Sequence, residues 1–86
     1  MPIISRFYGI SILMYFSEHN PPHFHAKYEG QLAAFNIKTG RIVAGDLPPK
    51  AKKLVKEWMK IHKDELLSDW HIAQNDGKLN VIEPLL

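Results

Sequence analysis

Residues 10–28 read ISILMYFSEHNPPHFHAKY, and this stretch decides the fold. Before the two prolines, apolar residues alternate with their neighbours from Ile10 to Phe16 in the period-two pattern of a half-buried strand. From His23 onward the same alternation resumes. Two successive prolines donate no amide hydrogen, so a strand cannot continue through them. The sequence therefore predicts two strands separated by a proline turn.

More strands are predicted on either side of this pair. Residues 3–8 form an earlier strand or the lead-in to the first one, with Gly9 marking a bend. Downstream, turn signals precede two short apolar segments, residues 32–37 and 42–45. Because the loops are short, the simplest construction is an antiparallel meander of three to five strands.

The second half of the chain changes to a helical period. Pro48 and Pro49 end the sheet, and a proline suits the first turn of a helix. Apolar residues then recur in two stripes that are slightly out of phase, with the capping residue Asp64 between them. We therefore expect one or two helices, about residues 48–62 and 64–75, packed on one face of the sheet. The stripes contain Ala51, Leu54, Val55, Trp58 and either Ile61 or His62, and then Leu66, Leu67, Trp70 and Ala73.

Residues 79–83 follow an Asp-Gly turn and predict a short C-terminal strand that returns to the sheet. Together these elements define an α+β fold in a single domain, because a chain of 86 residues leaves no room for a second core. Trp58 and Trp70 lie on the apolar stripes, so we expect both to anchor the core.

Composition narrows the possible functions. The chain contains no cysteine, which excludes disulfides, thiolate zinc sites and a cysteine nucleophile. Its hydrophobic content of 45% is ordinary for a globular protein. The first residues lack the pattern of a signal peptide, and no apolar run approaches the roughly 20 residues that span a bilayer. We expect a cytoplasmic protein without a membrane partner.

Three histidines, His19, His23 and His25, lie within seven residues. On a strand, His23 and His25 point to one face, opposite the expected core face, with Cα atoms about 6.5–7 Å apart. His19 lies across the proline turn, which could fold it back towards the pair. Neutral imidazole is a common ligand of zinc, copper and nickel, and three histidines that leave a position for water are typical of catalytic zinc. A divalent metal such as zinc is therefore one possible cofactor.

The same histidines permit two other interpretations. Two imidazoles held close together can divide the roles of general acid and general base near neutral pH, while Lys27 or Arg41 stabilises a phosphate. Alternatively, the cluster is structural, and His23 simply hydrogen-bonds the proline turn. Glu18 or Glu29 could serve as a metal ligand or as a base. The residues alone leave these alternatives open.

Positive charge is concentrated in the expected first helix. Residues 50–63 contain six lysines and one glutamate, a net charge of +5, which leaves −3 for the rest of the +2 chain. Phosphate backbones select such a basic stripe, although solvated helix faces and faces that bind an acidic protein look similar. Arginine is too scarce for dense readout of base edges. The candidate nucleic-acid-binding residues are Lys52, Lys53, Lys56, Lys60 and Lys63.

Several motifs resemble those of one bacterial family. They are Pro2-Ile3-Ile4-Ser5-Arg6-Phe7-Tyr8-Gly9-Ile10, His19-Asn20-Pro21-Pro22-His23-Phe24-His25-Ala26, Gly45-Asp46-Leu47-Pro48-Pro49, and Trp58 with Glu65-Leu66-Leu67-Ser68-Asp69-Trp70. Over essentially the whole chain, the sequence is similar to the domain of unknown function 4160 family. The resemblance implies a small prokaryotic protein commonly encoded beside another short protein in a two-gene, toxin–antitoxin-like unit. It implies no established activity and no catalytic residues.

Three functions follow as hypotheses. The first is a toxin-like enzyme or inhibitor that acts on RNA, in which the lysine-rich helix binds the backbone and the three histidines transfer protons. The second is a metal-binding or sensing module built on the same histidines. The third is a non-catalytic regulator that binds a protein partner or DNA. We rank the first highest and expect a small protein partner encoded by a neighbouring gene.

Overall fold

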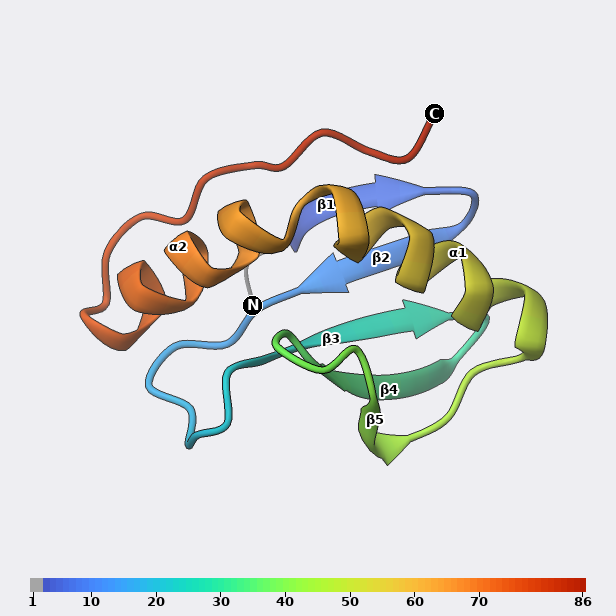
Figure 1. Cartoon of the computed structure of the whole chain (residues 1–86), viewed down its shortest axis with the longest axis horizontal. Helices are drawn as coiled ribbons and strands as arrows, with labels where there is room; N and C mark the ends of the chain where they lie inside the picture. The colour runs from blue at the N-terminus through green and yellow to red at the C-terminus, as the bar shows by residue number, and fades with distance from the viewer. Residues whose placement is uncertain (1–2) are drawn as a thin grey trace.

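The computed structural model describes residues 3–86, in which five strands are followed by two helices (Figure 1). Each strand pairs antiparallel with the next, in the order β1-β2-β3-β4-β5, so the predicted α+β meander is confirmed. Neither helix has both the length and the apolar character that crossing a bilayer requires, and residues 3–86 contain no other helix. The elements are β1 (Ile3–Phe7), β2 (Ile10–Leu13), β3 (His23–Tyr28), β4 (Gln31–Asn36), β5 (Ile42–Gly45), α1 (Pro49–Ile61) and α2 (Lys63–Gln74).

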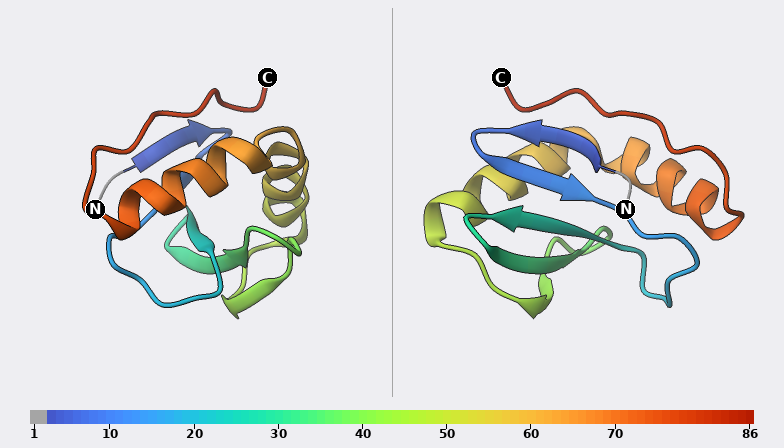
Figure 2. Two further views of the ribbon diagram at one scale, coloured as in Figure 1. Left: turned by 60° about the vertical axis from the view of Figure 1, so that its left-hand side comes forward. Right: turned by 180° about the vertical axis from the view of Figure 1, so that it is seen from behind.

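Both helices cover the same face of the twisted sheet, as predicted (Figures 1 and 2). The core lies between the helices and this face, and Phe24 and Phe35 on neighbouring strands stack there with ring centroids 5.5 Å apart. Trp58 of α1 is fully buried against Phe7 and Phe24, and Trp70 of α2 is also buried. The two tryptophans therefore anchor the core, as their positions on the apolar stripes indicate.

The strand before the proline turn is shorter than the sequence pattern predicts. β2 ends at Leu13, and although Met14 is still buried, Phe16 is 42% exposed. Ser17 has a positive φ of 54°, which lies outside the strand region of backbone conformation. The alternation up to Phe16 therefore does not continue as a hydrogen-bonded ladder.

The helices meet at His62, a buried residue that separates α1 from α2. Asp64, expected to cap the second helix, lies instead in its first turn beside Glu65, and His62 occupies the N-cap position. The two carboxylates lie near the positive end of the α2 dipole, where negative charge stabilises the helix. The Nδ1 atom of His62 lies 2.7 Å from a carboxylate oxygen of Glu65, which links the end of α1 to the first turn of α2.

The prediction of a C-terminal strand over residues 79–83 is wrong. After α2 the chain passes Asp69 of that helix and then runs beside β1 at Ile82 (Figure 1), but residues 77–86 form no strand. The Ile82 amide donates to the Ile4 carbonyl of β1 at 2.8 Å, and two residues later Pro84 has no amide hydrogen with which to extend a ladder.

Side-chain contacts, and not a ladder of backbone hydrogen bonds, hold this C-terminal segment against the fold. The indole nitrogen of Trp58 donates to the backbone carbonyl of Glu83 at 2.8 Å, which satisfies the polar atom of a fully buried ring. Ile82 is 1% exposed and belongs to the core, whereas its neighbour Val81 is 81% exposed. The segment therefore docks through every third residue, Leu79, Ile82 and Leu85, and does not become a sixth strand.

Candidate functional site

His23 and His25 form a close pair on β3. Between and after them, Phe24 and Ala26 point into the core and are fully buried, so the two histidines share the other face of the strand. Their ring centroids lie 5.4 Å apart, and both side chains are half-buried. The predicted pair on one face is present, although its rings are less exposed than side chains on a fully solvated strand face.

The ring of His23 is fixed by two contacts. Its Nδ1 atom lies 2.8 Å from the carbonyl oxygen of Pro21, and its ring packs 5.2 Å from that of the buried Trp70. A carbonyl oxygen only accepts hydrogen bonds, so Nδ1 carries the proton. In the neutral ring, Nε2 then holds a lone pair and can act as a base or a ligand.

His25 is kept neutral by its surroundings. Its ring lies edge-on to that of Tyr15 at 4.5 Å, and its Nδ1 atom is buried without a hydrogen-bond partner in residues 3–86. Burial first, and then repulsion by His23, lower the pKa of His25, against a smaller opposite effect of Glu18. His25 is therefore uncharged at neutral pH.

The three predicted histidines do not converge. His19 is exposed in the long loop between β2 and β3, because only His23 and His25 belong to the hydrogen-bonded strand. Across residues 3–86, no three His, Asp or Glu side chains gather in a way that could hold a metal ion. Glu29 lies beyond the opposite end of β3 from His23. The three-histidine arrangement expected for zinc is therefore not assembled.

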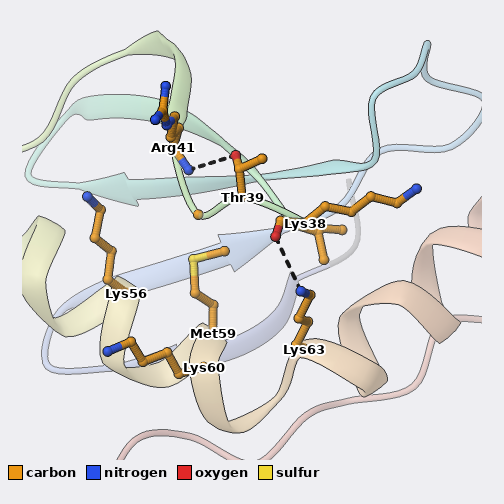
Figure 3. Close-up of a pocket in the computed structure, with 9 residues that line it drawn as sticks. Lys38, Thr39, Arg41, Lys56, Met59, Lys60 and Lys63 are labelled. Atoms are coloured by element: carbon orange, nitrogen blue, oxygen red, sulfur yellow. Dashed lines mark hydrogen bonds between the residues drawn. The ribbon is translucent and has the colours of Figure 1, made fainter.

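A second site, which we call the basic groove, lies between α1 and the turn that joins β4 to β5 (Figure 3). It is a hollow of about 250 Å³ whose lining contains five cationic side chains and, within the described residues, no carboxylate. Met59 lies at its centre, with cations from the helix and from the turn around it (Figure 3). The lining residues are Ile37, Lys38, Thr39, Gly40, Arg41, Lys56, Met59, Lys60 and Lys63.

The turn that forms one wall of the groove is held by Asn36. The side-chain oxygen of Asn36 accepts the amides of Lys38 at 2.8 Å and Thr39 at 3.1 Å, and its carbonyl accepts the Gly40 amide at 2.8 Å. The ammonium of Lys63 then donates to the Lys38 carbonyl at 3.2 Å (Figure 3). These bonds fix the turn against the start of α2, so the turn and the helices form the walls of one hollow.

The structure divides the five predicted lysines into two sets. Lys56, Lys60 and Lys63 line the basic groove. Lys52 instead forms an ion pair with Asp46 at 3.1 Å, and Lys53 lies outside the groove. The pKa of Asp46 is lowered by its hydrogen bond with Lys52, as expected for such a pair.

Sequence reasoning missed two members of the groove, Lys38 and Arg41. Both belong to a recognisable hairpin turn, whose sequence pointed to Arg41 only as a group that stabilises a phosphate beside the histidines. The sequence feature that could have identified them is a pair of cations on either side of the Thr39-Gly40 turn. Helix packing places this turn opposite the lysines of α1.

The histidine pair and the basic groove lie at the same end of the sheet. His23 is the register partner of Asn36 across β3 and β4. The next residue, Ile37, donates its amide to the Pro22 carbonyl at 2.9 Å and also lines the groove. The proline turn that positions His23 and the turn that carries Arg41 are thus joined by adjacent strands.

These features define a small α+β protein in which a five-stranded meander, covered by helices on one face, carries a histidine pair and a basic groove at one end. The chain belongs to the DUF4160 family, a domain of unknown function whose family model matches residues 9–71. The matched range contains both sites and leaves out β1 and the C-terminal segment. Comparison with curated proteins and with solved structures gives no match.

Proposed function

We propose that the protein acts on RNA, and that the basic groove binds the phosphate backbone. The observation that carries this proposal is that five cations from α1, the start of α2 and the turn between β4 and β5 line one hollow, which has no carboxylate lining it within the described residues. Each phosphate that such cations neutralise releases counterions, which is the main source of affinity for nucleic-acid backbones. The rim uses four lysines and one arginine, which suits backbone contact better than base-edge readout.

Charge reversal in the groove tests this proposal. Fluorescence anisotropy with a labelled 20-nucleotide RNA compares the wild-type protein with the double variant Lys56→Glu, Lys60→Glu. The matched control is Lys50→Glu, Lys78→Glu, which changes the net charge equally at exposed positions outside the groove. We expect the groove variant to bind at least about tenfold more weakly and the control to bind nearly as wild type, from the usual size of surface charge interactions. Equal binding by both variants, or no binding by the wild type, contradicts the proposal.

The histidine pair supports a second candidate function, proton transfer to the bound RNA. The Pro21 carbonyl holds His23 in the tautomer whose Nε2 accepts protons. In RNA cleavage, this nitrogen would take the proton of a ribose 2′-hydroxyl as its oxygen bonds to the adjacent phosphorus, and water would protonate the departing 5′ oxygen. Cleavage assays with His23→Ala and His25→Ala test this role, and cleavage that survives both changes contradicts it.

The biological setting of this proposal comes from the family resemblance. We infer that the protein is one member of a two-gene, toxin–antitoxin-like unit and that its partner is the small protein encoded by the neighbouring gene. RNA binding without cleavage would favour the non-catalytic, regulatory form of this role. Co-purification of the two proteins expressed together tests the partnership, and their complete separation on size-exclusion chromatography at micromolar concentration contradicts it.

A further inference from the structure

We propose that the basic groove accommodates one unpaired nucleotide, with its base on Met59 and its flanking phosphates on the cationic rim, so that the protein selects single-stranded over duplex RNA. This inference rests on the proposed RNA function and names the form of RNA that the same site would take. It follows from the floor of the groove, its rim and its size.

The floor of the groove is apolar, which binding of a phosphate alone does not require. Met59 is 5% exposed and Ile37 is 2% exposed, and both line the hollow beneath the charged rim. A thioether makes favourable contacts with aromatic rings, including at their edges. Gly40 lies beside this floor, since a Cβ atom at Gly40 would lie 4.0 Å from the sulfur of Met59. A side chain at this position would therefore contact the sulfur and cover more of the floor.

The rim supplies contacts for the sugar-phosphate backbone on both sides of the floor. Figure 3 shows Lys56 and Lys60 extending from α1 on one side of Met59, and Lys63 on the other side, near Lys38. Arg41 stands on the opposite wall (Figure 3). Its planar guanidinium can bind a phosphate through two hydrogen bonds or stack on a base, which is a recurrent mode of single-stranded RNA recognition.

The volume limits what can enter. The hollow is open to solvent on one side and provides about 250 Å³, less than the roughly 300–1,000 Å³ of pockets that hold drug-sized ligands. A single base can occupy such a space, whereas a duplex cannot, because its bases are stacked and paired inside the helix. A duplex would meet only the rim, and it would lose the contact with Met59.

The test separates contact with the base from contact with the phosphates. Anisotropy measures binding of a labelled 10-nucleotide single strand, the same strand with abasic sites, and the same strand in a duplex. The wild type should bind the intact single strand about two- to tenfold more tightly than either other probe, which is the usual range for contact between a thioether and an aromatic ring. Met59→Gln should lose this preference while it binds the abasic strand normally, and the volume-conserving Met59→Leu should keep most of it.

A surface variant protects this test against a folding defect at Met59. Arg41 is exposed, and Arg41→Lys keeps its charge but removes the planar group. We expect this variant to lose more affinity for the intact single strand than for duplex or abasic RNA, because the planar group can stack only on an unpaired base. If the wild type binds all three probes equally, the inference fails while the proposed function stands. If it binds none of them, the proposed function itself fails.

Discussion

The Nδ1 atom of His23 lies 2.8 Å from the carbonyl oxygen of Pro21, two residues earlier in the chain. This bond closes the proline turn onto the first residue of β3 and at the same time selects the tautomer of the imidazole. The structural and the chemical interpretations of this histidine are therefore compatible, because one nitrogen maintains the turn while the other is left as an acceptor.

Substitution of His23 should separate these two roles. His23→Ala should lower the free energy of unfolding by about 1 kcal/mol for the lost hydrogen bond, with a further loss from its packing on Trp70. His23→Asn places an amide donor near the position of Nδ1, so it should retain most of the bond but no base. Urea denaturation measures the stabilities. Equal destabilisation by the two variants would show that the bond to Pro21 contributes little.

The environment of His25 predicts a pH dependence of stability. The folded pKa lies below the unfolded value of 6.5, because burial and then His23 disfavour the charged ring. The unfolded chain therefore binds a proton more readily, and the stability contributed by the neutral ring is present above pH 6.5 and lost as the pH falls towards the folded pKa. Urea denaturation between pH 7.5 and pH 5 measures it. His25→Gln should lose less stability over this range than the wild type. The exposed control His71→Gln should lose about as much stability as the wild type.

The C-terminal segment offers a matched pair of substitutions. Ile82 is 1% exposed, so Ile82→Ala should lower the free energy of unfolding by about 2–5 kcal/mol, the usual cost of emptying a buried aliphatic site. Val81 is 81% exposed, so Val81→Ala should change it by less than about 0.5 kcal/mol. Chemical denaturation of both variants measures the difference. Similar stabilities would mean that the segment does not belong to the core.

Two glycines with similar backbone angles should respond differently to alanine. Gly30 and Gly45 have φ values of +79° and +69°, and each alanine substitution incurs about 1–2 kcal/mol of backbone strain. A Cβ atom at Gly30 meets nothing within 4 Å, whereas at Gly45 it would lie 2.1 Å from the Leu32 carbonyl oxygen. Gly45→Ala must therefore displace β5 from β4 and should be clearly the more destabilising in thermal unfolding. Equal melting temperatures would contradict the close approach of the two strands.

The salt dependence of RNA binding should report how many phosphates the basic groove contacts. For single strands, the slope of log K against log salt is about −0.7 for each phosphate contacted. Lys56→Ala should therefore reduce the magnitude of the slope by about 0.7, and the exposed Lys50→Ala, outside the groove, should leave it unchanged. Anisotropy titrations over a range of salt concentrations give both slopes. A change of the same size in both variants would place the contacts elsewhere.

Much of the fold could be predicted because the spacing of apolar residues in each strand or helix indicates which of its faces is buried. Alternation around Phe24 predicted both β3 and the shared face of His23 and His25. The apolar stripe through Trp58 predicted α1 and its buried side. The C-terminal strand was mispredicted because a short apolar segment after an Asp-Gly turn does not report whether its backbone groups find a partner strand, and this segment docks through every third side chain instead.

The candidate sites were less predictable, since they depend on which loops meet. Proximity in sequence suggested that His19 belongs with the histidine pair, yet it lies on an exposed loop. Distance in sequence concealed Lys38 and Arg41 from the lysines of α1, although they share one hollow. Lys52 lies on α1 with Lys56 and Lys60, but it forms an ion pair with Asp46 instead.

The amino-acid sequence by itself determined the meander, the helices and the pairing of His23 with His25, because the period of a strand or helix fixes the direction of each side chain relative to its own element. Tertiary structure alone decided the tautomer of His23, the burial of His25 and the assembly of the basic groove. Each of these depends on contacts between residues from different elements or across a turn, and on the loss of water from the space between them, which no periodic pattern records.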